Sequence, residues 1–356
     1  MFPADFAYAR ARSLDEALDL LDEAHAAGQE AKLIAGGQSL LPMMKLRLAA
    51  PEILIDLAGL PELTGGGWMA YAAGGGFGGS IGALTTYRQL GRQRYAGPDG
   101  TPALVNGVPG LDAGIPALAD ALAVLADPQV RARGTIGGAV AHGDPAADLP
   151  AVLLALNAEV FIAARAGTRE VILDDFLQGV YATDLAEDEI VTHVRIHATD
   201  ARGSAYEKFP HPASHLPLAG VCALVRLRDG VIERAAIAVT GISPRPYRAR
   251  EAERVLAGAP PAPDTLAAAA ARVTQLDGRE VSLLGDQHAS GPYRAHLANV
   301  LAGRALARAL DRARAATAER AAGERATEER ATGARAAGER ATGEPVTVER
   351  ATEEQP

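Results

Sequence analysis

Cysteine is almost absent from this chain of 356 residues, because Cys222 is the only one. A disulfide framework, a zinc-ribbon site and a cysteine-ligated iron–sulfur cluster each need several cysteines, so this chain alone can form none of them. Positive charge is not in excess either, since the formal net charge is −9 at pH 7. That balance gives no electrostatic argument for nucleic-acid binding.

Long hydrophobic runs are missing as well. The first residues, MFPADFAYARARS, lack the continuous apolar stretch of a signal peptide, and no uncharged apolar run is long enough to span a bilayer. We therefore expect a soluble, cytoplasmic protein without a membrane span. Aromatic residues make up 4% of the chain whereas 48% of its residues are hydrophobic, so small aliphatic side chains must build most of its cores.

The N-terminal part of the sequence predicts a small α/β unit over residues 1–57. Ser13 is a good helix N-cap, and Glu16 completes a capping box ahead of leucines that share one helical face. A short strand then leads into Gly36 and Gly37, and EILIDL (52–57) predicts a second strand.

Residues 65–82 are rich in glycine and contain the pattern Gly74-x-Gly76-x-x-Gly79, with Asp99 further on. As a pattern this matches the dinucleotide-binding fingerprint of the Rossmann fold. The buried strand that should precede these glycines and the apolar helix that should follow them are both missing, so we reject the fingerprint. We expect a flexible excursion between strands here.

The rest of the sequence predicts further helices and strands in two more parts. The expected helices are 116–126, one from about 148, 264–276 and 292–310, and the expected strands are 158–164, 169–173 and 189–196. A change in composition near 198–204 marks a boundary, after which Asp229-Gly230 between apolar runs predicts a β-hairpin. The expected domains are 1–200, with subdomains 1–57 and 58–200, and 203–312.

The C-terminal tail, 313–356, repeats five-residue units such as ERAAG and ERATG. It has no aromatic residue, and its only large aliphatic residues are Val346 and Val348. Such a segment cannot bury enough surface to offset the loss of chain entropy. We expect it to be disordered or transiently helical.

Two short segments, AGGQS (35–39) and TIGGA (135–139), have a similar pattern. Backbone amides in glycine turns can form an anion-binding nest, and the N-terminus of a following helix adds its dipole. Two such nests could enclose one extended diphosphate, which favours a dinucleotide ligand. Gly-Gly pairs also occur in ordinary turns, so the spacing alone leaves that alternative open.

Three longer stretches carry a resemblance to a known family: residues 35–49, 126–156 and 206–221. Together they resemble the FAD-binding medium subunit of molybdenum hydroxylases, of the aerobic carbon monoxide dehydrogenase and xanthine dehydrogenase type. The resemblance implies an α+β fold with a two-part FAD-binding domain of the vanillyl-alcohol-oxidase (PCMH) type. A smaller α+β C-terminal domain and the tail would follow.

The resemblance also implies which residues surround FAD. They are Lys32, Leu33, Ile34, Ala35, Gly36, Gly37, Gln38, Ser39, Leu40, Thr135, Ile136, Gly137, Gly138, Ala139, Asp148, Ile190, Val191 and Lys208. Asp148 would contact the ribose or adenine end, or cap the helix that begins there. Lys208 would lie near the flavin ring, or be solvated at a domain edge. Ile190 and Val191 would pack against flavin, or belong to an ordinary strand core.

The implied function is electron transfer. A molybdenum large subunit would oxidise the substrate, a small subunit with two [2Fe-2S] clusters would pass the electrons to FAD, and FAD would reduce an external acceptor. A heterohexamer is the implied assembly, and neither a catalytic side chain nor a metal site is expected in this chain. Two alternatives stay open: a stand-alone flavoenzyme of the same fold, and a non-catalytic assembly subunit that has lost FAD. Ala139, where the family commonly has asparagine, and the surroundings of His215, which lack the acid or glycine often seen there, favour the last alternative.

Overall fold

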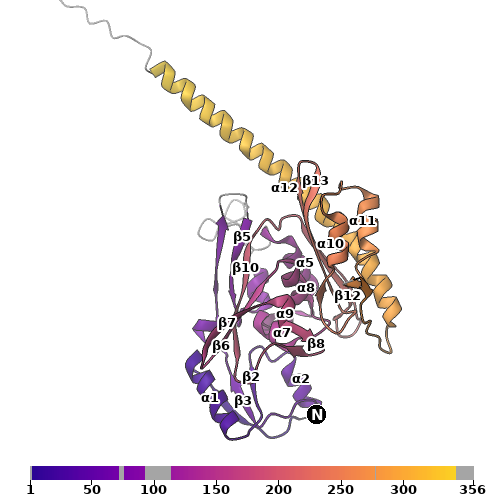
Figure 1. Ribbon diagram of the computed structural model, residues 1–356. Coiled ribbons are helices and arrows are strands. Elements are labelled where there is room, and N and C mark those ends of the chain that lie inside the picture. The colour runs from indigo at the N-terminus through magenta and orange to yellow at the C-terminus, as the bar shows by residue number, and fades with distance from the viewer. Residues whose placement is uncertain (1, 72–75, 93–113, 277, 342–356) are drawn as a thin grey trace, which may run out of the picture. The chain divides into compact units, whose positions relative to one another are not determined.

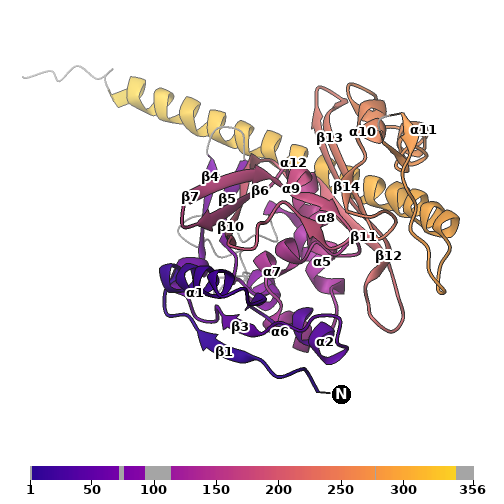
Figure 2. The same cartoon turned by 60° about the horizontal axis from the view of Figure 1, so that its bottom comes forward.

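The computed structural model describes residues 2–71, 76–92, 114–276 and 278–341. The chain divides into two compact units, 1–313 and 314–356. The first unit contains all the sheets and both glycine segments, and Figures 1 and 2 show it from two directions.

A three-stranded parallel sheet and helix α1 (Leu14–Ala26) form the N-terminal subdomain. The strand order is β1 (Ala7–Arg10), β3 (Ile53–Asp56), β2 (Ala31–Ile34), so β1 lies at one edge (Figure 2). The Ser13 hydroxyl caps α1 by accepting from the Glu16 N–H at 3.1 Å, as the sequence predicts. The Glu16 carboxylate accepts from the Arg12 N–H at 2.7 Å, which completes the reciprocal cap one residue earlier than expected.

A five-stranded antiparallel sheet forms the second subdomain. Its strand order is β4 (Gly66–Tyr71), β5 (Gly76–Gly82), β10 (Ile190–Thr199), β6 (Glu159–Ala164), β7 (Gly167–Ile172). The predicted strands 158–164, 169–173 and 189–196 are confirmed within three residues as β6, β7 and β10. The expectation of a flexible excursion over 65–82 is wrong for the described residues, because strands on both sides of β5 pair with it. Non-local pairing overrides the low strand propensity of glycine here.

The Rossmann fingerprint is rejected by the structure as well. Gly76 and Gly79 lie inside antiparallel β5, where no phosphate-binding loop leads into a helix. Gly74 and Asp99, the other residues of that pattern, fall outside the described residues.

Short helices cover one face of the five-stranded sheet. They are α3 (Tyr87–Arg92), α5 (Pro116–Val124), α6 (Pro128–Arg133), α7 (Ile136–His142), α8 (Asp148–Ala155) and α9 (Leu173–Phe176). Val160, Ile162 and Val194 point into the core that the sheet shares with these helices. On the other face, the Arg195 guanidinium lies 4.0 Å from the ring centre of Phe161. Smaller elements complete the region: η1 (Pro61–Leu63), α2 (Leu40–Lys45), β8 (Leu177–Gly179) and β9 (Ala182–Thr183).

The C-terminal part of the first unit is a second antiparallel sheet with helices. Its strand order is β11 (Ser204–Pro210), β12 (Pro217–Arg228), β13 (Val231–Thr240), β14 (Tyr247–Arg248). The predicted hairpin is confirmed: Asp229 and Gly230, with φ of +51° and +79°, join β12 to β13. The accompanying elements are α10 (Arg250–Leu256), α11 (Pro263–Ala270), β15 (Gln275–Leu276), β16 (Arg279–Glu280) and the start of α12 (Gly291–Ala341).

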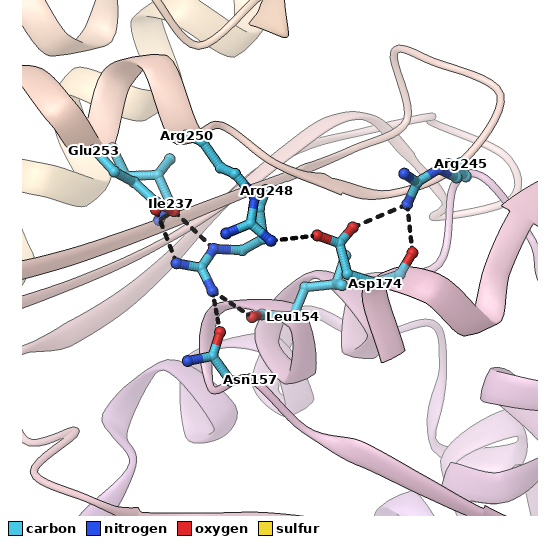
Figure 3. A network of polar contacts seen from close by, with 8 residues as sticks. All are labelled: Leu154, Asn157, Asp174, Ile237, Arg245, Arg248, Arg250 and Glu253. Atoms are coloured by element: carbon cyan, nitrogen blue, oxygen red, sulfur yellow. Dashed lines mark hydrogen bonds and ion pairs between the residues drawn. The ribbon is translucent and has the colours of Figure 1, made fainter. Parts of the chain in front are cut away.

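Both faces of this sheet are buried. Val221 and Val239 pack against α10, α11 and the start of α12, whereas Cys222 and Ala238 belong to the core that contains α5 and α8. Arg248 adds a polar connection at the end of α8, because its guanidinium donates to the Leu154 carbonyl at 3.1 Å and to Asn157 (Figure 3).

The described part of the tail, 314–341, continues helix α12. These residues are helical in the structure, and the expectation of a disordered or transiently helical tail stays a prediction. Residues 342–356 fall outside the described part. Within the described residues, no helix combines the length and the apolar character that a membrane crossing requires.

Candidate functional site

The two glycine segments, far apart in the sequence, lie side by side in the structure. A Cβ atom on Gly36 would lie 2.2 Å from the carbonyl oxygen of Arg133 and 2.9 Å from the Cα of Gly134. Only a glycine can approach the backbone this closely. The turn after β2 therefore lies close to the residues just before α7. One extended ligand bound by both segments would require them to be this close.

The first segment, 35–39, is a loop with unused backbone donors. Gly37 has a φ of +72°, and α2 begins directly afterwards at Leu40. Within the described part of the chain, the N–H groups of residues 36–39 donate to no protein acceptor, and Gln38 and Ser39 are exposed. Consecutive backbone amides without a protein acceptor suit an anion such as a diphosphate.

The second segment, 135–139, is different from the nest that the sequence predicts. It is the capped first turn of α7, in which the Thr135 hydroxyl accepts from the Gly138 N–H at 3.1 Å. The N–H groups of Ile136 and Gly137 donate to the carbonyls of Thr85 (3.0 Å) and Ala83 (2.9 Å). The expectation of a second open nest is therefore wrong, because the protein itself uses these amides.

What the second segment offers is a backbone surface without a side chain. Gly138 is exposed, and a Cβ atom there would meet only the Thr135 hydroxyl, at 2.8 Å. Gly137 is buried, and a Cβ atom there would lie 2.4 Å from the Cβ of Ala83. Gly137 thus serves packing, whereas Gly138 leaves room for a ligand beside the free amides of 36–39. The two segments fit a diphosphate.

Asp148 and Lys208 form a buried ion pair. The Lys208 ammonium lies 2.9 Å from the Asp148 carboxylate and donates to the Val124 carbonyl at 3.1 Å. The hydroxyl of Tyr206 donates to the same carboxylate at 2.8 Å. Asp148 is the first residue of α8 and does not cap it, so the N-cap alternative is wrong. The solvated alternative for Lys208 is also wrong, because its side chain is 2% exposed.

Burial dominates the electrostatics of this pair. It raises the pKa of Asp148, although the Lys208 charge and the hydrogen bonds from Lys208 and Tyr206 act in the opposite direction. Burial and the Asp148 charge raise the pKa of Tyr206 well above its ordinary value. The resemblance places Asp148 and Lys208 at different ends of an extended cofactor. Because the structure brings the two side chains into contact, they cannot lie at opposite ends of an extended cofactor.

Ile190 and Val191 are buried and point into two different cores. Ile190 packs in the core of the N-terminal subdomain, and Val191 in the core shared by the five-stranded sheet and its helices. The pair thus lies where the two subdomains meet. Lys32 is on the surface, where its ammonium lies 3.9 Å from Glu30, while Leu33 and Ile34 are half-buried in β2.

Several residues near the site carried no sequence signal. Tyr206 contacts Asp148 only because β11 runs beside α5, close to the start of α8, and Thr240 contacts the turn before α8 only through the end of β13. A cavity of about 410 Å³ lies between α3, α5 and α6, where Tyr87, Arg88 and Arg131 contribute to its lining. Among the residues that the structure describes, no group of three or more His, Cys, Asp or Glu side chains could hold a metal ion.

Two protein-family models match the chain. The FAD-binding domain in molybdopterin dehydrogenase matches residues 4–198, and the CO dehydrogenase flavoprotein C-terminal domain matches residues 204–309. The first model alone covers more than half of the chain. This chain therefore belongs to the family of FAD-binding medium subunits of molybdenum hydroxylases, and its cofactor is FAD.

Individual relatives agree with this assignment. The glyceraldehyde dehydrogenase medium chain of Sulfolobus acidocaldarius is 33% identical over 301 residues, covering 85% of this chain and 97% of the relative. The nicotine 6-hydroxylase medium subunit of Paenarthrobacter nicotinovorans is 35% identical over 302 residues, covering 85% and 96%. In the solved carbon monoxide dehydrogenase of Hydrogenophaga pseudoflava, a chain 36% identical to this one superposes with a TM-score of 0.75, covering 88% of this chain and 99% of that chain.

Proposed function

We propose that this chain carries FAD between its two glycine segments and transfers electrons from a [2Fe-2S] partner subunit to an external acceptor. The observation that carries the proposal is the set of unpaired N–H groups of residues 36–39, in a loop whose Gly36 lies against Arg133 and Gly134, just before α7. When bound, FAD supplies the redox chemistry, since it takes up electrons and passes them on. The chain itself binds the cofactor, orients it and excludes water.

The proposed role of each site residue follows from its position. The amides of residues 36–39 hold the diphosphate, and Gly138 and Ala139 let it approach α7 closely. Lys32, Leu33, Ile34 and Leu40 flank the loop, and Thr135, Ile136 and Gly137 fix α7. Ile190 and Val191 support the flavin side. The side chains of Asp148 and Lys208 are 4% and 2% exposed. They contact the cofactor when it binds, and part of the ion pair between them is then replaced by contacts with the cofactor.

The proposed assembly contains two partner chains. Relatives of this chain are medium subunits of named multi-subunit dehydrogenases. A molybdenum large subunit would oxidise the substrate, and a small subunit would hold the clusters, because a single cysteine cannot ligate them here. We infer a cytoplasmic heterohexamer that donates its electrons to an external acceptor.

The test is the visible absorbance of the purified full chain, followed by chromatography of the cofactor that heat releases. Flavin bands and released FAD are expected. The variant Gly138→Glu places a carboxylate where the diphosphate would lie and should abolish the bands. Gly303→Glu is the matched control, because a side chain there meets nothing within 4 Å, and it should retain FAD.

Other outcomes of the same experiment support the alternatives. A chain that stays colourless after incubation with FAD, both alone and with its partner subunits, would contradict the proposal and favour a non-catalytic assembly subunit. Flavin reduction by an alcohol or hydroxy acid, without partner subunits, would favour a stand-alone flavoenzyme. Equal loss of FAD in both glutamate variants would contradict the placement of the diphosphate.

A further inference from the structure

The turn that joins α7 to α8, residues 143–147, is held by the C-terminal sheet. The Gly241 N–H donates to the Pro145 carbonyl at 2.9 Å. The Thr240 hydroxyl lies 2.9 Å from the Pro145 carbonyl oxygen and 2.9 Å from that of Ala147. These contacts join the end of β13 to a turn that lies far from it in the sequence.

Thr240 is well placed to fix this turn. It is the last residue of β13, it is fully buried, and it pairs with Gly220 of β12. A hydroxyl has a single proton, so it donates to one of the two carbonyls at a time and bridges both. The Ala147 carbonyl immediately precedes Asp148, and the side chain of Asp148 is held by Tyr206 and Lys208 of the same sheet.

A movement of the turn would reach the start of α8 rather than α7. Helix α7 has seven residues, so its axis is only about 10 Å long. Its start is fixed to Ala83 and Thr85, and its end at Gly143 accepts from the Tyr181 N–H at 3.1 Å. Because both ends of α7 are anchored elsewhere, a displaced turn shifts Asp148, which directly follows Ala147, and leaves Gly138 in place.

We propose that Thr240 is a positioning residue of the FAD site, which sets the position of Asp148 from the C-terminal domain. This inference rests on the proposed function, because it assumes that FAD lies against Asp148. Binding sites lose affinity when their supporting contacts allow small displacements. The C-terminal domain is then part of the cofactor site even where it does not touch FAD.

The experiment measures the FAD dissociation constant and the visible circular dichroism of the bound flavin in three variants of the full chain. Thr240→Val removes the hydroxyl at nearly constant volume, and Thr240→Ser restores it. Tyr247→Phe is the matched control, because it removes another buried hydroxyl of the same domain, which donates to the Val273 carbonyl at 2.7 Å.

We expect Thr240→Val to weaken FAD binding about tenfold, equivalent to about 1.4 kcal/mol, and to change the flavin dichroism. Thr240→Ser should recover most of the affinity, and Tyr247→Phe should lower the melting temperature without weakening FAD binding. If Thr240→Val binds FAD as tightly as the unmodified chain, or if Tyr247→Phe weakens binding equally, the positioning role is wrong. If the unmodified chain binds no FAD, the proposed function itself fails.

Discussion

Gly137 and Gly138 are neighbours in the sequence but face opposite surroundings. Gly137 packs against strand β5 and its continuation at Ala83, whereas Gly138 is exposed at the start of α7. The absence of a side chain therefore has a different physical reason at each position. A substitution at Gly137 tests packing, and a substitution at Gly138 tests ligand access.

Gly137→Ala should destabilise the fold. Its Cβ atom would lie 2.4 Å from the Cβ and 2.7 Å from the Cα of Ala83, so the backbone of α7 or of residue 83 must shift. Overpacking of this kind costs about 1–3 kcal/mol, which urea unfolding of the purified chain would measure. Gly303→Ala, at an open helical position, is the control and should stabilise by about 0.5–1 kcal/mol. Equal stability of the two variants would contradict the packing role of Gly137.

The pair of Asp148 and Lys208 makes a separate prediction at the residue scale. Lys208→Met leaves a carboxylate buried without its cation, which should cost about 3–5 kcal/mol near neutral pH. Loss of the cation raises the pKa of Asp148 further, and the protonated acid is the form that the folded state tolerates. Stability of this variant should therefore fall as pH rises through that pKa, so its deficit should be smaller at about pH 5 than at about pH 8.

Urea unfolding of four proteins at both pH values tests this prediction: the unmodified chain, Lys208→Met, Asp148→Asn and the double variant. The double variant should be more stable than Lys208→Met alone, because it buries no charge at these two positions. A deficit of Lys208→Met that is the same at both pH values would show that the buried carboxylate is not its cause.

At the scale of elements, helix α5 and strand β11 are joined by a series of polar contacts. Ser204 Oγ accepts from the Ala117 N–H at 3.1 Å, and Asp120 Oδ2 accepts from the Tyr206 N–H at 3.1 Å. Lys208 reaches the Val124 carbonyl in the same direction. Successive turns of α5 therefore contact alternate residues of β11. This arrangement places Tyr206 and Lys208 beside Asp148.

Asp120 connects this series to α12, and its charge should make the contact sensitive to acid. Burial alone would raise the pKa of Asp120, but hydrogen bonds from Arg312 and the Tyr206 backbone, with the charges of Arg312 and Arg308, hold it below its ordinary value. A lowered pKa contributes stability that is present above the ordinary pKa and lost as pH falls through the folded one.

Asp120→Asn should therefore lower stability at about pH 7 by about 1–3 kcal/mol, and it should flatten the loss of stability between about pH 5 and about pH 3. Thermal unfolding across this pH range measures both effects. Asp188→Asn, which alters an exposed carboxylate, is the control and should follow the unmodified chain. A pH profile of Asp120→Asn parallel to that of the unmodified chain would contradict the role of Asp120.

Elements with local signals could be predicted from the sequence, and elements made by distant contacts could not. The Ser13 cap of α1 and the Asp229-Gly230 turn depend on neighbouring residues, and both predictions are confirmed. Strand β1 was not foreseen, because its four residues are a strand only through pairing with β3. Strand β5 was misjudged for the same reason, since it also pairs with the distant β10, whereas β4 was misjudged because its glycines have low strand propensity.

The candidate site follows the same rule. The sequence pattern identified both glycine segments, and the free amides of residues 36–39 agree with the predicted nest. The prediction for residues 135–139 was wrong in form, because Thr135 caps a helix whose first amides bond to residues 83 and 85. Tyr206 and Thr240 had no local signal, since a tyrosine or threonine in a strand looks the same whether or not it faces a site.

At the scale of the whole first unit, α8 is the element that both halves share. All eight of its residues are buried, and its core includes Tyr206, Cys222 and Leu224 of the C-terminal sheet. At its end, the Arg248 guanidinium donates to the Leu154 carbonyl and forms a bidentate ion pair with Glu253 (Figure 3). Nearby, Arg245 and Arg250 both donate to the Asp174 carboxylate. Neither half can keep α8 covered by itself, so residues 1–313 should unfold together.

Calorimetry of the full chain with and without FAD tests this cooperativity. One transition is expected for residues 1–313, and FAD at about a hundred times its dissociation constant should stabilise it by about 2.7 kcal/mol. For a unit of this size, that corresponds to a rise of about 4 °C in the melting temperature. Gly138→Glu should keep the single transition and lose the rise. If calorimetry shows two transitions and FAD raises the temperature of only one, the C-terminal sheet unfolds independently. Helix α8 would then have to remain folded without half of its core.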